Sequence, residues 1–406
     1  MAWFGDPFEP GNLTWVGLIG GAMALGHPGL MKLWSRQPRL HSLAGLMMTA
    51  LVARLLIFPM APGDDFWRYW WEGMIQAQGF NPYLLAPNDA VLADWRTDWW
   101  SKINHRDWAT IYPPLTELMF RGLAWSGPAT ILAFKTSYLL ADLLIIWLLA
   151  KWSPEAGGGI RSAMGYALHP LPLFAFCGSA HFDVWMVAAL MLGLFLVTQG
   201  EGRRWRWAGA ATAIGLAAAV KVIPLLCGFI WLRAFGKRVF WLALVPLLLV
   251  GPAFLFGFPE VNPWANLNSF AIHARFNDFF WWLLDPLLKW ELGGTNELFL
   301  KLTISVVGVI GLAIRRDWQS GIFLSLGAVL LLAPVLYPWY VAWILPLAFL
   351  QRSLFWQASA GTIMLSLSLF DPMREGWLPL YLDRWVIVGV PCLLLLWSWA
   401  KKGRTN

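Results

Sequence analysis

The chain has 406 residues, of which 58% are hydrophobic and 13% are charged, and its mean hydropathy is +0.56. A soluble domain carries about 25% charged residues, so this composition excludes an ordinary soluble protein, a disordered chain and a collagen-like repeat. The three cysteines lie in apolar runs without a short common spacing, which argues against a disulfide framework or a thiolate metal site. Because a bilayer span needs about 20 apolar residues, we expect an all-α polytopic membrane protein with about 11–13 transmembrane helices.

Apolar runs separated by basic clusters predict the positions of the spans. Residues 207–232 predict two half-length helices that turn at Lys221 and are too short to cross a core about 30 Å thick alone. No region looks like a soluble domain, so residues 1–406 are expected to form one transmembrane domain. The predicted spans, in chain order, are residues 13–33, 42–60, 129–150, 161–179, 183–199, 238–257, 297–314, 319–336, 339–350, 354–371 and 383–400.

The net charge of +7 is concentrated in clusters of Lys and Arg that all fall on the same side of these spans. Because cytoplasmic loops carry an excess of Lys and Arg, this pattern predicts an inner- or plasma-membrane protein with a cytoplasmic C-terminus. We interpret the positive charge as topology and contact with anionic lipid, so we expect no nucleic-acid partner. The long loops, at residues 60–126, 258–297 and 371–383, are then expected on the external face.

The first of these loops opens with GDDFWRYWWEG, in which Asp64 and Asp65 follow the second predicted span directly. Helical spacing of aromatic residues predicts an amphipathic helix over Phe66–Gln78 at the membrane surface, and Pro113 suits the start of a second helix. A carboxylate at such a place can act as general base toward a hydroxyl. The ordinary alternative is that Asp64 caps the Phe66–Gln78 helix and Asp65 pairs with Arg68.

Four segments together resemble a known group of enzymes. They are DDFWRYWWEG…GFNPY…AP…TIYPP in the first loop, CGSAHFD at Cys177–Asp183, AVKVIPLL at Ala219–Leu226, and APVLYPWYVAWILPLA at Ala333–Ala348. In this order they are similar to bacterial GT-C glycosyltransferases related to glycosyltransferase family 87 and to the GPI mannosyltransferases. The resemblance implies a GT-C-type fold with a catalytic first external loop. It also implies a polyprenyl-phosphate sugar donor, usually mannose, and an acidic pair that Asp64 and Asp65 match.

The family mechanism implies roles for individual residues. Asp64, with Asp65 as second choice, would deprotonate an acceptor hydroxyl that attacks the anomeric carbon in line, so that polyprenyl phosphate leaves with inversion. Charge that develops on the phosphate calls for cations. Lys221 is the first candidate, because an intramembrane cation is costly without a partner, although it can also snorkel to the headgroups. The other basic candidates for the donor phosphate or substrate are Arg68, His273, Arg275, Arg374 and Arg384.

Further polar and aromatic residues are candidates for substrate binding. His181 and Asp183 are expected to hold an acceptor hydroxyl or to complete the hydrogen bonds of the base, and ordinary buried hydrogen bonding is the alternative. With six histidines and none at ligand-like spacing, we predict no catalytic metal and no other cofactor, while a divalent ion on the carboxylate pair stays open. The aromatic candidates are Tyr112, Tyr337, Trp339 and Tyr340.

Two other functions compete with the predicted hexosyl transfer, for which mannose is the first choice. A transporter would explain a broken helix at Lys221, but it would place polar residues at mid-membrane, where Asp142 is the one acidic residue that the predicted spans supply. A flippase or assembly factor for lipid-linked glycans would explain the aromatic residues but not the ordered carboxylates. For the predicted enzyme, the partners are the polyprenyl-phosphate sugar, the bilayer, and a glycolipid, polysaccharide or protein acceptor.

Overall fold

The fold was analysed in a computed structural model of the full chain. Among the residues that it describes, α-helices and short 3-10 and π segments make up most of the chain, and no β-strand forms. One isolated β-bridge joins Phe276 to Val335. The all-α prediction is confirmed for this part of the protein. The described residues are 9, 11–199, 204–278, 297–313, 317–370, 386, 388–394 and 396.

The described helices, in chain order, fall in two halves of the chain. The N-terminal half contains α1 (Asn12–Ser35), α2 (Leu43–Ile57), α3 (Asp64–Ala77), α4 (Pro114–Ala124), α5 (Thr130–Lys151), α6 (Ile160–Ala167), α7 (Pro170–Pro172), the π-helix Leu173–Gly178 and α8 (Asp183–Thr198). The C-terminal half contains α9 (Arg204–Val220), α10 (Gly228–Phe235), α11 (Leu244–Val250), α12 (Ala265–His273), α14 (Glu297–Ala313), α15 (Trp318–Leu332), α16 (Pro338–Val341), α17 (Leu345–Leu350) and α18 (Leu354–Thr362). The 3-10 helices are Pro38–Leu40, Ala90–Trp95, Trp100–Lys102, Gly127–Ala129, Pro154–Ala156, Ile223–Cys227, Gly236–Ala243, Gly251–Phe256 and Ile363–Phe370.

Most of the apolar runs overlap these helices, but the predicted spans 161–179 and 339–350 are each divided into shorter helices, and 383–400 lies largely outside the described residues. Among the described residues, Gly127–Lys151 and Ile223–Phe256 are long and apolar enough to cross a membrane, and the bent pair α7–α8 is a third span if it counts as one. The number of 11–13 spans therefore stays a prediction. The predicted break at Lys221 coincides with the end of α9. The predicted separate span at 238–257 instead continues one helical run, because 3-10 turns follow α10 after Gly236.

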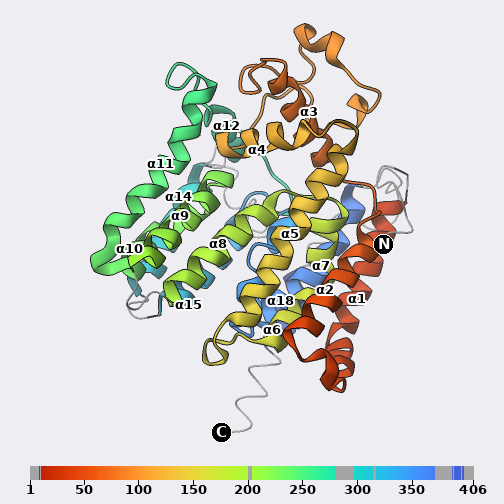
Figure 1. The fold of residues 1–406 in the computed structure, drawn as a ribbon, viewed down its shortest axis with the longest axis vertical. Coiled ribbons are helices and arrows are strands. Elements are labelled where there is room, and N and C mark those ends of the chain that lie inside the picture. The colour runs from red at the N-terminus through yellow and green to blue at the C-terminus, as the bar shows by residue number, and fades with distance from the viewer. Residues whose placement is uncertain are drawn as a thin grey trace.

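The first long loop, residues 60–126, forms a cap at one end of the helical body (Figure 1). Figure 1 shows α3, α4 and α12 together at this end, while α8, α9 and α15 lie beneath them. α3 packs directly on α4, and Gly73 makes this approach possible, because a Cβ atom there would lie 2.4 Å from the carbonyl oxygen of Phe120. Apolar side chains of α3 fill the space below, so the amphipathic helix predicted at a membrane surface is largely buried within the protein.

A sharp bend separates the π-helix from α8. The two helical arms, Pro170–Gly178 and Asp183–Thr198, meet at an angle of 120°. Ala180 at the bend has φ 64°, a left-handed conformation that costs energy for any residue with a Cβ. The backbone N–H of His181 donates to the carbonyl of Ala175, which helps to hold the bend closed. As a result, the polar residues of CGSAHFD are buried beneath the start of α3, where Gly63 N donates to Ser179 O at 2.9 Å.

Candidate active site

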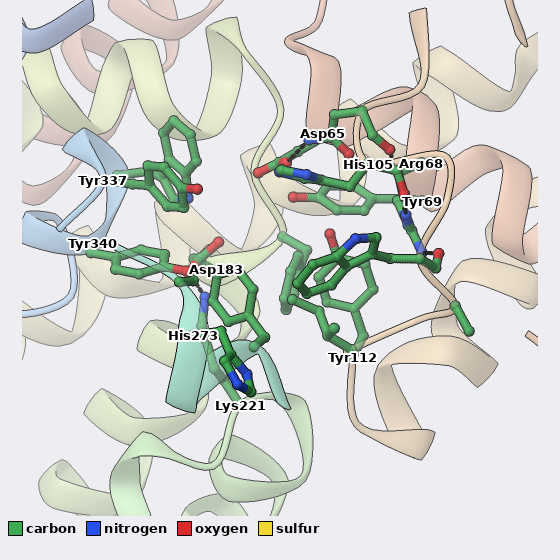
Figure 2. A pocket seen from close by; sticks show the side chains of 18 of the residues that line it. Asp65, Arg68, Tyr69, His105, Tyr112, Asp183, Lys221, His273, Tyr337 and Tyr340 are labelled. Atoms are coloured by element: carbon green, nitrogen blue, oxygen red, sulfur yellow. Dashed lines mark hydrogen bonds and ion pairs between the residues drawn. The ribbon is translucent and has the colours of Figure 1, made fainter. Parts of the chain in front are cut away.

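A cavity of about 370 Å³ opens between the cap and the helical body. In Figure 2 its labelled side chains form two groups, with Asp65 and the residues of the first loop in one and Tyr337, Tyr340, Asp183 and Lys221 in the other. α3 and the following loop supply the first group, while α8, the end of α9 and α16 supply the second. The residues that line the cavity are Asp65, Arg68, Tyr69, Asn104, His105, Trp108, Ala109, Ile111, Tyr112, Phe182, Asp183, Lys221, Phe270, His273, Ala274, Arg275, Tyr337, Trp339 and Tyr340.

The structure contradicts the alternative in which Asp64 caps the helix and Asp65 pairs with Arg68. α3 begins at Asp64 itself, so Gly63 is the N-cap residue, and no side chain caps the helix. Asp65 does not pair with Arg68, because the Arg68 guanidinium is bound to Glu72 at 2.7 Å, one helical turn further along α3. Both carboxylates lie in the first turn, where the positive end of the helix dipole stabilises negative charge.

Asp65 is held in place by an amide and an imidazole. Asn104 Nδ2 donates to Asp65 Oδ1 at 2.5 Å and lies 3.3 Å from Asp64 Oδ2, so one amide links both carboxylates. His181 Nδ1 lies 3.4 Å from Asp65 Oδ2. The side chain of Asp65 is nevertheless 19% exposed and lines the cavity, whereas Asp64 does not line it. Asp65 is therefore the carboxylate of the pair that a molecule in the cavity meets.

The two carboxyl groups differ in acidity. Burial and the negative charge of Asp65 raise the pKa of Asp64 to about 6. Burial acts in the same direction on Asp65, but the adjacent imidazole of His181, the hydrogen bond from Asn104 and the charge of Lys221 outweigh it and hold the pKa of Asp65 below its ordinary value. Asp65 is thus ionised at neutral pH, as a proton acceptor must be.

Lys221 and Asp183 form an ion pair on the other side of the cavity. Lys221 Nζ lies 2.6 Å from Asp183 Oδ1, and the indole Nε1 of Trp343 donates to the same oxygen at 2.8 Å. The Lys221 ammonium also lies over the rings of Tyr340 and Trp343, at 4.3 and 4.5 Å from the ring centres. Lys221 therefore does not snorkel as an isolated cation, since a carboxylate and two aromatic faces stabilise its charge.

A buried polar network beneath the first group fixes the loop that carries Asn104. Arg68 donates to the backbone carbonyls of His105 at 2.8 Å and Trp108 at 2.6 Å, in addition to its bond with Glu72. Burial and the charge of the neighbouring Glu72 raise the pKa of Glu117 well above its ordinary range, and the Thr110 hydroxyl contacts both carboxyl groups, at 3.2 Å from Glu72 and 2.6 Å from Glu117. The network ties α3, α4 and the loop into one rigid unit.

Two further elements complete the walls. His273 at the end of α12 and Arg275 just after it line the cavity, and Arg275 lies 3.6 Å from Asp278. On the side of α16, Trp339 stacks on His181 with ring centres 3.8 Å apart and on Tyr337 at 4.7 Å. The His181 imidazole that contacts Asp65 is therefore part of a stack with Trp339 and Tyr337.

The structure brings most of the candidate residues of the sequence to this one cavity. Asp64 and His181 lie directly behind its wall, while Arg374 and Arg384 are outside the described residues. Sequence reasoning missed Asn104 and Trp343, which bind the carboxylates of Asp65 and Asp183, because neither residue carries a charge or a motif that would single it out. The candidate residues that line the cavity are Asp65, Arg68, Tyr112, Asp183, Lys221, His273, Arg275, Tyr337, Trp339 and Tyr340.

Comparison with known proteins shows to which family the chain belongs. Residues 12–235, more than half of the chain, match the family model of the alpha-(1->6)-mannopyranosyltransferase N-terminal domain. The chain belongs to this family. It is thus a membrane glycosyltransferase of a mannosyltransferase family, as the resemblance of the four segments implied. No curated protein and no solved structure matches the chain significantly. The matched range includes Asp65, His181, Asp183 and Lys221, and the aromatic residues of α16 lie beyond it.

The mannosyltransferase shows no cluster of three or more His, Cys, Asp or Glu side chains suited to a metal ion in the part of the chain that the structure describes. The carboxylates of Asp64 and Asp65 are instead linked by Asn104. The absence of a catalytic metal stays a prediction.

Proposed function

We propose that the protein transfers mannose from a polyprenyl-phosphate donor to an acceptor hydroxyl, with inversion at the anomeric carbon. The observation that carries this proposal is the convergence of the family-matched polar residues on one cavity, with the ionised Asp65 in its wall. The family is described by an α-(1→6) product. A single displacement inverts the anomeric carbon, so the donor would be the β-linked mannosyl phosphate.

Asp65 is the proposed general base, in place of Asp64. Its exposed carboxylate would accept the proton of the acceptor hydroxyl while the acceptor oxygen forms its bond to the anomeric carbon. The bond from that carbon to the phosphate oxygen breaks in the same step, and polyprenyl phosphate leaves with the electron pair. Asn104 and His181 would keep Asp65 oriented, and Asp64, which is outside the wall, would tune its acidity. Such a base contributes roughly 100- to 10,000-fold to the rate.

His273 and Arg275 are the proposed ligands of the donor phosphate. Both line the cavity from α12 and the residues that follow it, on a segment that Asn266 fixes to the first loop by donating to the carbonyl of Thr110 at 3.1 Å. The N–H donors of the Arg275 guanidinium and the His273 imidazole would bind the phosphate oxygens as negative charge develops on them, with Asp278 close to Arg275. A leaving phosphate needs no proton, and we propose that the reaction needs no metal ion and occurs on the external face.

The test uses the purified full-length protein with short-chain polyprenyl-phosphate mannose in both anomeric forms and with mannoside acceptors. We expect an α-linked product from the β donor only, unchanged by a chelator. Asp65→Asn should lose roughly 100- to 10,000-fold in kcat. Asp64→Asn is the matched control on the same helical turn and should lose far less. Full activity of Asp65→Asn would refute its role as base, and no transfer by well-folded protein that binds polyprenyl phosphate would favour an assembly factor.

A further inference from the structure

The carboxylate of Asp183 has one oxygen that accepts no hydrogen bond from the described residues. Asp183 is only 1% exposed, and its Oδ1 already accepts from Lys221 and Trp343. Within the described ranges no group makes a hydrogen bond to Oδ2. Leaving a buried carboxylate oxygen without a donor is costly, so native structures nearly always supply one. Asp183 lines the cavity, and the donor for Oδ2 is therefore expected from a molecule that binds there.

The charge of this corner favours a neutral hydroxyl over a phosphate. Lys221 and Asp183 together carry no net charge, because their charged atoms are 2.6 Å apart. A phosphate that approached Lys221 would also approach the negative Oδ2 and be repelled. A sugar hydroxyl suits both groups, since it can donate to Oδ2 while a neighbouring sugar oxygen accepts from the ammonium. Lys221 therefore does not suit the phosphate-binding role expected from the sequence.

The position of the pair relative to Asp65 indicates which sugar it meets. In an in-line displacement the base, the acceptor oxygen, the anomeric carbon and the leaving oxygen follow one another. The ring of the transferred sugar therefore lies beyond the acceptor oxygen as seen from the base. In Figure 2, Asp183 and Lys221 belong to the group of side chains that faces the group of Asp65. They are thus on the donor side of the cavity.

We propose that Asp183 Oδ2 accepts a hydrogen bond from one hydroxyl of the transferred mannose, and that Lys221 donates to a neighbouring oxygen of the same ring. This inference rests on the mannosyl transfer proposed above. It makes the ion pair a determinant of sugar specificity, because a donor without the matching hydroxyl leaves a buried carboxylate unpaired. Trp343 would act as a positioning residue that holds Asp183 through Oδ1.

The first measurement compares donors on the wild-type protein. Polyprenyl-phosphate mannose and its 2-, 3-, 4- and 6-deoxy forms are assayed with one fixed acceptor. We expect kcat/KM to fall about 10- to 100-fold for the donor that lacks the hydroxyl bound by Asp183, which is the range for a hydrogen bond to a charged group. Equal kcat/KM for all the deoxy donors would overturn the proposal without a variant.

The second measurement repeats the panel with Asp183→Asn. The deoxy donor that is worst for the wild type should lose only about 2- to 3-fold in this variant, because the interaction has already been removed. Asp142→Asn makes the same substitution at another buried carboxylate, remote from the cavity, and should change all donors by one common factor. If Asp183→Asn does not fold, Lys221→Gln tests the neighbouring hydroxyl in the same way.

The outcomes separate this inference from the proposed function. No transfer by the wild-type protein with any donor would refute the proposed function. Transfer by the wild type, combined with a loss in Asp183→Asn that is the same for every donor, would refute only the sugar contact and leave Asp183 a structural partner of Lys221. If Asp183→Asn changed the relative rates of deoxy acceptors and not those of deoxy donors, the assignment of this contact to the transferred sugar would likewise be overturned.

Discussion

Two buried ion pairs with similar geometry occupy different parts of the protein. Arg54 Nε and Asp142 Oδ2 are 2.8 Å apart between α2 and α5, and Lys221 Nζ and Asp183 Oδ1 are 2.6 Å apart between α9 and α8. Both side chains of the first pair are fully buried, and Tyr166 donates to the second oxygen of Asp142 at 2.7 Å. In the second pair the Lys221 side chain is 19% exposed and Asp183 Oδ2 has no donor in the described part of the chain.

The Arg54–Asp142 pair joins helices, whereas the Lys221–Asp183 pair faces the cavity. Arg54 reaches the carbonyl oxygens of Ala50 and Ala167, so its contacts hold α2 and α6 to the carboxylate on α5. Each pair leaves one buried polar atom without a hydrogen bond among the described residues, Arg54 Nη2 and Asp183 Oδ2, but only Asp183 and Lys221 line the cavity. Burial and distance alone would rank the two pairs as equals. An unsatisfied atom on a residue that lines a cavity, and not an unsatisfied atom alone, distinguishes a candidate site from a structural contact.

The largest expected effect comes from removing one partner of the Arg54–Asp142 pair. Asp142→Leu should lower the free energy of unfolding by about 3–5 kcal/mol, because an unpaired guanidinium stays buried. Adding Arg54→Met should restore most of this loss, with normal transfer per folded molecule. The matched pair Asp183→Leu with Lys221→Met should also restore stability, but with transfer reduced at least about 100-fold. The measurements are unfolding in detergent and initial rates of mannosyl transfer.

If the two double variants behave alike, the two ion pairs do not differ in function. A double variant at the cavity that retains transfer would show that Asp183 and Lys221 have only a structural role. A double variant at Arg54 and Asp142 that is stable but inactive would show that the remote pair contributes to the reaction.

The sequence was sufficient to locate the helices and most of the cavity. Hydropathy placed α1, α2 and α5 within a few residues, because long apolar runs between charged clusters have few alternatives. The acidic pair, CGSAHFD and the Lys221 break pointed to the site, since charge next to an apolar run is costly without a purpose. Which segments meet is a tertiary property, however, and only the bend before α8 brings Asp183 next to Lys221.

The hydrogen-bond and ion-pair partners of the site residues were much harder to predict from the sequence than the positions of those residues. Local spacing suggested that Asp65 pairs with Arg68, three residues away on the same helix, but Arg68 binds Glu72 and Asp65 is held by residues 39 and 116 positions distant. Neutral donors such as Asn104 and Trp343 leave no trace in charge or hydropathy. The choice between Asp64 and Asp65 depended on the rotation of α3 about its axis, which the adjacent positions of the two residues in the chain could not reveal.

The acidity of the cavity provides a prediction of intermediate size. The pKa of Asp64 is raised to about 6 in the folded protein, so between about pH 4 and pH 6 the folded state binds more protons than the unfolded state. The stabilisation by protonated Asp64 is complete below its unfolded pKa and is lost as the pH rises through about 6. Relative to Asp64→Asn, the wild type should therefore lose on the order of 1–3 kcal/mol of stability between pH 4 and pH 7.

The same titration should appear in the reaction. Ionisation of Asp64 brings a second negative charge next to Asp65 and makes that base stronger, so kcat/KM should rise with pH through about 6. Asp64→Asn should lack this rise while it retains transfer. Melting temperatures and rates measured from pH 4.5 to pH 8, in roughly half-unit steps, test both effects. An identical rise in the variant would assign the titration to another group.

The smallest effects are expected from replacing the neutral side chain that donates a hydrogen bond to the carboxylate of each pair. Tyr166→Phe removes the donor to Asp142 Oδ1 and should cost about 1–3 kcal/mol of stability, because the oxygen is sealed from water, with no change in KM. Trp343→Phe removes the equivalent donor to Asp183 Oδ1 but leaves Lys221 in place and keeps an aromatic face beneath it. Its expected effect is a rise of about 3- to 10-fold in KM for the donor with little change in melting temperature, since the cavity supplies other partners for the carboxylate. If Trp343→Phe lowered stability and left KM unchanged, the two pairs would differ only in their surroundings, and unsatisfied atoms would no longer distinguish the site.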